Sequence, residues 1–157
     1  MEESISSHRC SYVQCDIVDE DQVKAMVDWT VNTYGGLDVI FCNAGKVTST
    51  AAQTILELDL SEFDKVIPVH ARGTAICVKQ AAHKMTELGS RGIIICTSSV
   101  MATTSRPSST DCTMLKNAVL GLMRCASQQL GVHGIRVNSR IWARHRWRYG
   151  EFYWAVH

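Results

Sequence analysis

The sequence of 157 residues is short of proline, of net charge and of long hydrophobic runs. Its 16 lysines and arginines nearly balance its 15 acidic residues, and a net charge of +1 excludes a protein that holds nucleic acid by charge over its whole surface. No run approaches the roughly 18 apolar residues of a membrane-spanning helix, so we expect no membrane partner. The first residues, Met1-Glu2-Glu3, are acidic where a secretory leader is basic, and we expect a cytoplasmic protein.

The sequence also lacks any Cys-x-x-Cys pair or nearby cysteine and histidine cluster, although it contains seven cysteines. Zinc sites need ligands that converge within a small loop, so we expect no metal site. Most of the cysteines lie in apolar runs, as Cys42 and Cys96 do, where a reduced thiol packs as a small hydrophobic side chain. The odd number of scattered cysteines indicates a reducing compartment.

Short apolar runs alternate with amphipathic stretches along most of the chain. They predict strands at residues 10–15, 37–42, 93–96 and 135–138, and helices at residues 19–34, 61–88 and 111–130. Pro68 is expected to kink or loosen the second helix. Alternating strands and helices predict a doubly wound α/β fold with a parallel sheet, and apolar strands favour helices on both faces, in three α/β/α layers.

Residues 140–157 differ from the rest and are expected to be an irregular tail after a domain at residues 1–139. The tail holds three of the four tryptophans, and its four arginines and one glutamate give it a net charge of +3. A basic aromatic segment can bind single-stranded nucleic acid by phosphate contacts and base stacking. The interpretation that we prefer is a tail that binds no nucleic acid and packs against an exposed sheet edge.

Three groups of residues are candidates for chemistry. Asn43-Ala44-Gly45 follows the second predicted strand, Ser98-Ser99 ends the third, and Lys116 lies early in the third predicted helix. Ligands of open α/β sheets bind outside the carboxyl ends of the strands, so the first two groups are expected at one rim.

Taken together, the motifs of the chain resemble the short-chain dehydrogenase/reductase family, and within it plant members such as secoisolariciresinol dehydrogenase and xanthoxin dehydrogenase. The motifs are Cys15-Asp16-Ile17, the runs at residues 36–45, 93–99 and 111–122, and Gly134-Ile135-Arg136-Val137-Asn138. The resemblance implies an NAD(P)-dependent oxidoreductase that acts on a small alcohol or ketone. It also implies an incomplete Rossmann-like sheet, truncated and divergent. In the strand order of the family's sheet, two strands lie between those predicted at residues 10–15 and 37–42, and this sequence does not contain them.

The family mechanism uses a tyrosine, a lysine four residues later, a serine thirteen residues before the tyrosine, and an asparagine. On that spacing Ser99 and Lys116 match, whereas Cys112 occupies the tyrosine position and His70 the asparagine position. A cysteine side chain is too short to reach where a phenol oxygen would lie, and general acid–base catalysis needs direct hydrogen-bond reach. Cys112 is therefore expected to be an inert thiol, with a reactive thiolate beside Lys116 as the alternative.

The resemblance implies NAD or NADP as the cofactor, with contacts from Asp16, Ile17, Asn43, Ala44, Gly45 and Lys116. No glycine-rich turn precedes Asp16, although such a turn and a helix N-terminus would hold the pyrophosphate. We therefore expect weak cofactor binding and impaired catalysis.

Two alternatives to an active oxidoreductase are a non-catalytic homologue that associates with a full-length relative and a binding module that uses its tail. This family commonly dimerises through the two helices predicted at residues 61–88 and 111–130. Both carry apolar stripes, and we expect a homodimer or a mixed dimer with a full-length homologue; the stripe residues are Ile76, Ala81, Met85, Leu115, Leu122 and Met123.

Overall fold

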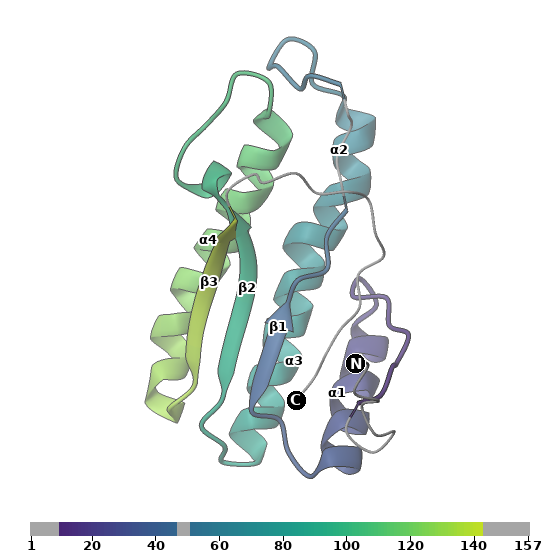
Figure 1. The fold of residues 1–157 in the computed structure, drawn as a ribbon, viewed down its shortest axis with the longest axis vertical. Coiled ribbons are helices and arrows are strands. Elements are labelled where there is room, and N and C mark those ends of the chain that lie inside the picture. Colours follow the sequence, from purple (N-terminus) through teal and green to yellow (C-terminus); the bar gives the residue numbers. More distant parts are fainter. Residues whose placement is uncertain (1–9, 47–50, 143–157) are drawn as a thin grey trace, which may run out of the picture.

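The computed structural model describes residues 10–46 and 51–142. Within them, helices and strands alternate along the chain (Figure 1). The elements are α1 (Glu20–Tyr34), β1 (Val39–Cys42), α2 (Leu60–Ile67), the π-helical segment η1 (Pro68–Gly73), α3 (Thr74–Glu87), β2 (Ile93–Ser99), the 3₁₀ turn η2 (Val100–Ala102), α4 (Thr110–Leu130), the 3₁₀ turn η3 (Gly131–His133) and β3 (Arg136–Trp142).

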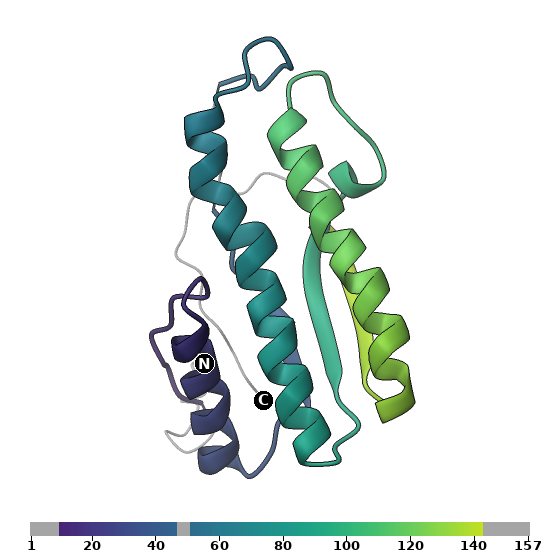
Figure 2. The ribbon, with the colours of Figure 1, turned by 180° about the vertical axis from the view of Figure 1, so that it is seen from behind.

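The three strands form one parallel sheet in the order β1-β2-β3. Helices α3 and α4 cover the same face of this sheet and α1 packs beside α3, as the two opposite views show (Figures 1 and 2). Burial alternates along β1 and β2, because one face meets the helices and the other is only half-buried. The described residues therefore form an α/β structure with a sheet and one helical layer. The helical layer expected on the other face of the sheet is not formed by them.

The strand predicted at residues 10–15 was wrong, because these residues form no strand in the structure. A β-strand exists through its ladder of hydrogen bonds to a neighbour. Among the described residues, β1 pairs only with β2, so no described strand offers a ladder to the segment at residues 10–15. The described sheet consequently has three strands and not four.

Helix α1 begins and ends where the sequence predicted. The Asp19 side chain accepts hydrogen bonds from the backbone N–H groups of Asp21 and Gln22, which otherwise have no partner in the first helical turn. Gly35 ends the helix with a φ of 86°, a left-handed conformation that glycine adopts without steric cost.

The long second helix loosens at Pro68, as predicted. Proline has no N–H, and its ring clashes with the carbonyl of the preceding turn, so an α-helix cannot continue through it without distortion. The chain accommodates Pro68 by widening into η1, which ends at Gly73 before α3 begins. A Cβ at Gly73 would lie 2.7 Å from Ile17 Cδ1, so the glycine lets η1 approach the segment before α1 closely.

The core lies between the sheet and the helices α1, α3 and α4. Ile76, Ala81, Met85 and Leu115 of the expected dimer stripes are buried within the single chain. These four residues therefore serve the core, and only Leu122 and Met123 of the stripes are partly exposed.

Strand β3 continues to Trp142 and includes the first three residues of the segment that was expected to be irregular. None of the described helices is both long and apolar enough to cross a membrane.

Candidate functional site

The carboxyl ends of β1 and β2 are tied together by a side-chain hydrogen bond. Thr97 Oγ1 of β2 donates to Asn43 Oδ1, directly after β1, at 2.7 Å. The predicted groups at Asn43–Gly45 and Ser98–Ser99 therefore lie along one rim of the sheet, as parallel strands require. Residue Thr97, which sequence reasoning did not single out, makes the connection.

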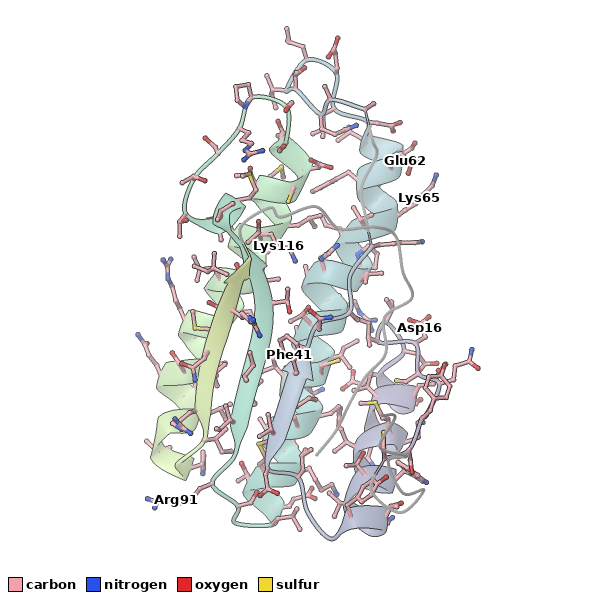
Figure 3. All side chains as sticks on the ribbon, in the orientation of Figure 1. Asp16, Phe41, Glu62, Lys65, Arg91 and Lys116 are labelled. Atoms are coloured by element: carbon pink, nitrogen blue, oxygen red, sulfur yellow. The ribbon has the colours of Figure 1, made fainter. Side chains whose placement is uncertain are left out.

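Lys116 reaches the same rim from α4, where Figure 3 labels it near the carboxyl end of β2. Its Nζ donates to the backbone carbonyl of Thr97 at 3.2 Å, so Thr97 holds both Asn43 and Lys116. Burial lowers the pKa of Lys116 below its ordinary value, and the nearby Cys112 opposes that shift. The ammonium is consequently held in place on the side of α4 that faces β2.

His70 lies in η1, is only 7% exposed, and contacts the loop that follows β1. Its Nε2 lies 3.1 Å from the backbone nitrogen and 2.7 Å from the carbonyl oxygen of Lys46, and the tautomer decides which of the two it binds. Burial lowers the pKa of His70, the backbone contact with Lys46 opposes this, and the charge of Lys116 adds to it. A Cβ at Gly45 would lie 2.8 Å from His70 Cε1, so the imidazole fills the space beside Gly45.

The other two predicted catalytic residues are Ser99, the last residue of β2, and Cys112, near the start of α4. Ser99 is half-buried and caps η2, because its Oγ accepts from the Met101 N–H at 3.3 Å. Cys112 is half-buried in the first turn of α4, one turn before Lys116. Lys116 lies close enough to both Cys112 and His70 to interact with them electrostatically. Ser99 instead stabilises the turn between β2 and α4.

Asp16 lies apart from this rim, beside α1 (Figure 3), and Ile17 follows it in the chain. Asp16 Oδ1 accepts from the Val18 N–H at 3.0 Å, and the exposed carboxylate faces solvent. The Ile17 side chain is buried in the core against Gly73, so only its backbone is placed to contact a ligand. Ala44 likewise packs against the core.

Gln53 is a second structural residue that the sequence did not reveal. Its side chain is buried, and its Oε1 accepts from the Asp59 N–H at 3.0 Å. Its backbone N–H donates to Ser108 O at 3.1 Å, and its carbonyl accepts from Thr110 N at 3.0 Å. Gln53 therefore joins the loop after β1 to the loop before α4, and a single glutamine in a polar run carries no signal for such a role.

The cofactor that the family implies is a nicotinamide dinucleotide. Asp16, the loop Asn43–Gly45 and Lys116 offer a carboxylate, backbone groups and an ammonium of the kinds that bind a nucleoside and its ribose hydroxyls. The types of group therefore suit a nucleoside and a ribose, although Asp16 lies beside α1 and Lys116 lies at the carboxyl end of β2. Among the described residues, no three His, Cys, Asp or Glu side chains are grouped to hold a metal ion.

Comparisons with known proteins agree with this architecture. A family model described as enoyl-(acyl carrier protein) reductase matches residues 1–140. The chain is 64% identical over 137 residues to (-)-isopiperitenol/(-)-carveol dehydrogenase, mitochondrial, of Mentha piperita, and 62% identical over 139 residues to (+)-cis,trans-nepetalactol synthase of Nepeta racemosa. Each match covers 87% of this chain, and the chain spans about half of these relatives' length, 51% and 52%.

Among solved structures, a short-chain type dehydrogenase/reductase from Mycobacterium marinum superimposes with a TM-score of 0.73 at 32% sequence identity. The superposition covers 81% of this chain and 51% of that one. The resemblance seen in the motifs is thereby confirmed, and the fold is of the Rossmann type. The chain belongs to the short-chain dehydrogenase/reductase family.

Proposed function

We propose that the chain carries the alcohol and ketone site of an NAD(P)-dependent oxidoreductase in which the proton-transfer step is impaired. The observation that carries this proposal is Cys112, which stands one turn before the held Lys116, at the position where the family has a tyrosine. The half-buried setting of the thiol and the fixed position of the ammonium support it.

The roles of the individual residues follow from their contacts. Lys116 holds a positive charge at the rim, where it orients a hydroxyl or carbonyl group of a ligand. A thiol at Cys112 ends several bond lengths short of a phenol oxygen, so it does not bring a proton to the same atom. Ser99 Oγ accepts a hydrogen bond from Met101 and keeps its hydroxyl hydrogen for a ligand oxygen.

His70 takes the position of the family's asparagine, and its imidazole contacts the Lys46 backbone. In this proposal it keeps the loop Asn43–Lys46 in one conformation and carries no proton to a substrate. NAD or NADP, when bound, supplies or accepts a hydride. Asp16, the loop Asn43–Gly45 and Lys116 are the residues of this chain that would contact it.

The substrate class in this proposal is a small alcohol or ketone. Two plant relatives with more than 60% identity are named for carveol and isopiperitenol oxidation and for nepetalactol synthesis. Compounds of this kind carry a hydroxyl or carbonyl group on an apolar frame, which suits the Lys116 ammonium and the Ser99 hydroxyl at the rim.

A second candidate function is that of a non-catalytic homologue that associates with a full-length relative or with itself. It is favoured by the face of the sheet that the described helices leave uncovered, where Phe41 and Ile95 are paired across β1 and β2 and are half-buried (Figure 3). Apolar sheet faces are ordinarily covered by another layer. A third possibility, a binding module in the segment at residues 140–157, lies almost entirely outside the described residues.

The test is a fluorescence titration of the 157-residue chain with NADH and with NADPH, followed by turnover assays with carveol and carvone. We expect no tight binding, in line with the weak cofactor binding expected from the sequence, and no turnover. Turnover of carveol or carvone by the unaltered chain would contradict the proposal. Cys112→Tyr restores a phenol beside Lys116, and we expect no activity from this change alone, because hydride transfer also requires a firmly held nicotinamide. Turnover by this variant would show that the phenol alone was limiting.

A further inference from the structure

Cys112 and Lys116 are a thiol and an amine on the same side of α4. They are four residues apart, and side chains at that spacing on a helix are neighbours, with about 5–6 Å between their Cβ atoms. Both residues are half-buried, and Lys116 interacts electrostatically with Cys112. The hydrogen bond from Lys116 Nζ to Thr97 O fixes the amine at the rim of the sheet.

The surroundings of the pair favour nucleophilic chemistry. Burial lowers the pKa of Lys116, so a larger share of its amine is unprotonated and nucleophilic near neutral pH. The imidazole of His70 lies close enough for Lys116 to influence its pKa, and burial favours its neutral form. Lys116 is the basic residue one helical turn from the thiol, and the buried Asp111 precedes Cys112 in the chain. A positive neighbour stabilises the thiolate, which is the nucleophilic form of a cysteine.

We propose that Cys112 and Lys116 together capture α,β-unsaturated aldehydes as a two-point covalent adduct. The thiolate of Cys112 adds to the β-carbon of the aldehyde, and the α-carbon takes up a proton from solvent in place of the one that the thiol lost. The Lys116 amine then condenses with the aldehyde carbon to form an imine, and one water molecule leaves. No oxidant or reductant takes part, and the new activity does not need the nicotinamide cofactor.

The inference rests on the proposed function in one respect only, namely that this rim accepts carbonyl compounds. It differs in the role of the two residues, which here act as nucleophiles toward the ligand carbons. The loss of the phenol impairs reversible proton transfer, whereas the thiol that replaces it adds a group able to form a carbon–sulfur bond.

The chain contains a matched control in Cys125. This thiol lies on the same helix and is exposed, but its neighbours three and four residues away are Gly121, Leu122, Gln128 and Gln129, none of which carries an amine like that of lysine. Cys125 can therefore add to an unsaturated aldehyde but cannot complete the second bond within its helix. Exposed Cys10 is a further thiol that reacts without a requirement for Lys116.

The experiment treats the full chain with trans-2-hexenal at pH 7.5, reduces it with borohydride, and maps the tryptic peptides by mass spectrometry. We expect one hexenal to link Cys112 and Lys116. The adduct has the mass of hexenal minus one water, plus the two hydrogens that borohydride adds to the imine. Trypsin is expected not to cleave after the modified Lys116. Cys125 is expected to carry a hexenal that has lost no water and whose aldehyde borohydride has reduced to an alcohol. Lys116→Arg keeps the positive charge and should abolish the water-loss product, and Cys112→Ala should abolish both products at this helical turn.

A water-loss product that persists in Lys116→Arg, or modification confined to Cys10 and Cys125, would overturn the inference. A second reagent, o-phthalaldehyde, tests the same pair independently, because it forms a fluorescent isoindole where a thiol and an amine are neighbours. The isoindole signal is expected to be lost in Cys112→Ala, and an unchanged signal would count against the pair. Neither readout uses the cofactor. A negative result here therefore counts against the covalent capture alone, and turnover of carveol or carvone by the unaltered chain counts against the proposed function alone.

Discussion

The contact between Gly45 and His70 allows a sharp test of how the candidate site is built. In Gly45→Ala the new Cβ would lie 2.8 Å from His70 Cε1, closer than real Cβ contacts. The imidazole has little freedom to move away, because it is buried and its Nε2 contacts the Lys46 backbone. Overpacking of this kind costs about 1–3 kcal/mol of unfolding free energy. At about 2–4 °C per kcal/mol for a chain of this size, the melting temperature should fall by about 2–12 °C.

A double-mutant cycle separates this contact from a general weakness of the loop. His70→Ala removes the hydrogen bond to the backbone of the exposed Lys46, which costs about 0.5–1.5 kcal/mol, and opens space beside Gly45. In the double variant the methyl of the new alanine at position 45 enters that space. The loss of unfolding free energy in the double variant should therefore be smaller than the sum of the two single-variant losses by about 0.5–3 kcal/mol. Urea unfolding followed by circular dichroism measures all four chains. Gly36→Ala, with nothing within 4 Å of its Cβ, is the control and should change stability by less than about 0.5 kcal/mol. Strict additivity, or a Gly45→Ala variant as stable as the parent, would refute the reasoning.

Three further predictions concern stability. Gly121→Ala in α4 places a methyl where nothing lies within 4 Å, and the higher helix propensity of alanine should raise the unfolding free energy by about 0.5–1 kcal/mol in urea titrations. Asp19→Ala removes the cap of α1 and should lower it by about 0.5–2 kcal/mol, with hydrogen exchange faster at the Asp21 and Gln22 amides. Because the pKa of His70 is lowered by burial, the folded chain binds fewer protons there than the unfolded chain below pH 6.5. This contribution to stability is complete above pH 6.5 and is lost as the pH falls from 6.5 toward the folded pKa. The urea midpoint should therefore drop between pH 7.5 and 5 more steeply in the parent than in His70→Gln, and parallel curves would contradict the assignment.

The sequence alone determined the local elements and the motifs of this protein. Asp19 and Gly35 mark the ends of α1 because capping depends on the side chain or backbone freedom of one residue. The irregular turn at Pro68 was predictable for the same reason, since proline alters the backbone wherever it stands. The motifs that include Ser99 and Lys116 indicated the family, and the family model that matches residues 1–140 confirms it.

Only the tertiary structure decided which segments pair and which face each helix covers. The segment at residues 10–15 has the composition of a strand, yet a strand depends on a neighbour that composition does not supply. The apolar stripe residues Ile76 and Met85 look the same in sequence whether they face a partner or the core, and the packing of α3 on the sheet places them in the core. The links from Thr97 to Lys116, from His70 to Lys46 and from Gln53 to Asp59 join residues that packing or loop geometry brings together. Hydrogen bonds of this kind leave no periodic trace in the sequence, because each depends on where two separate segments meet.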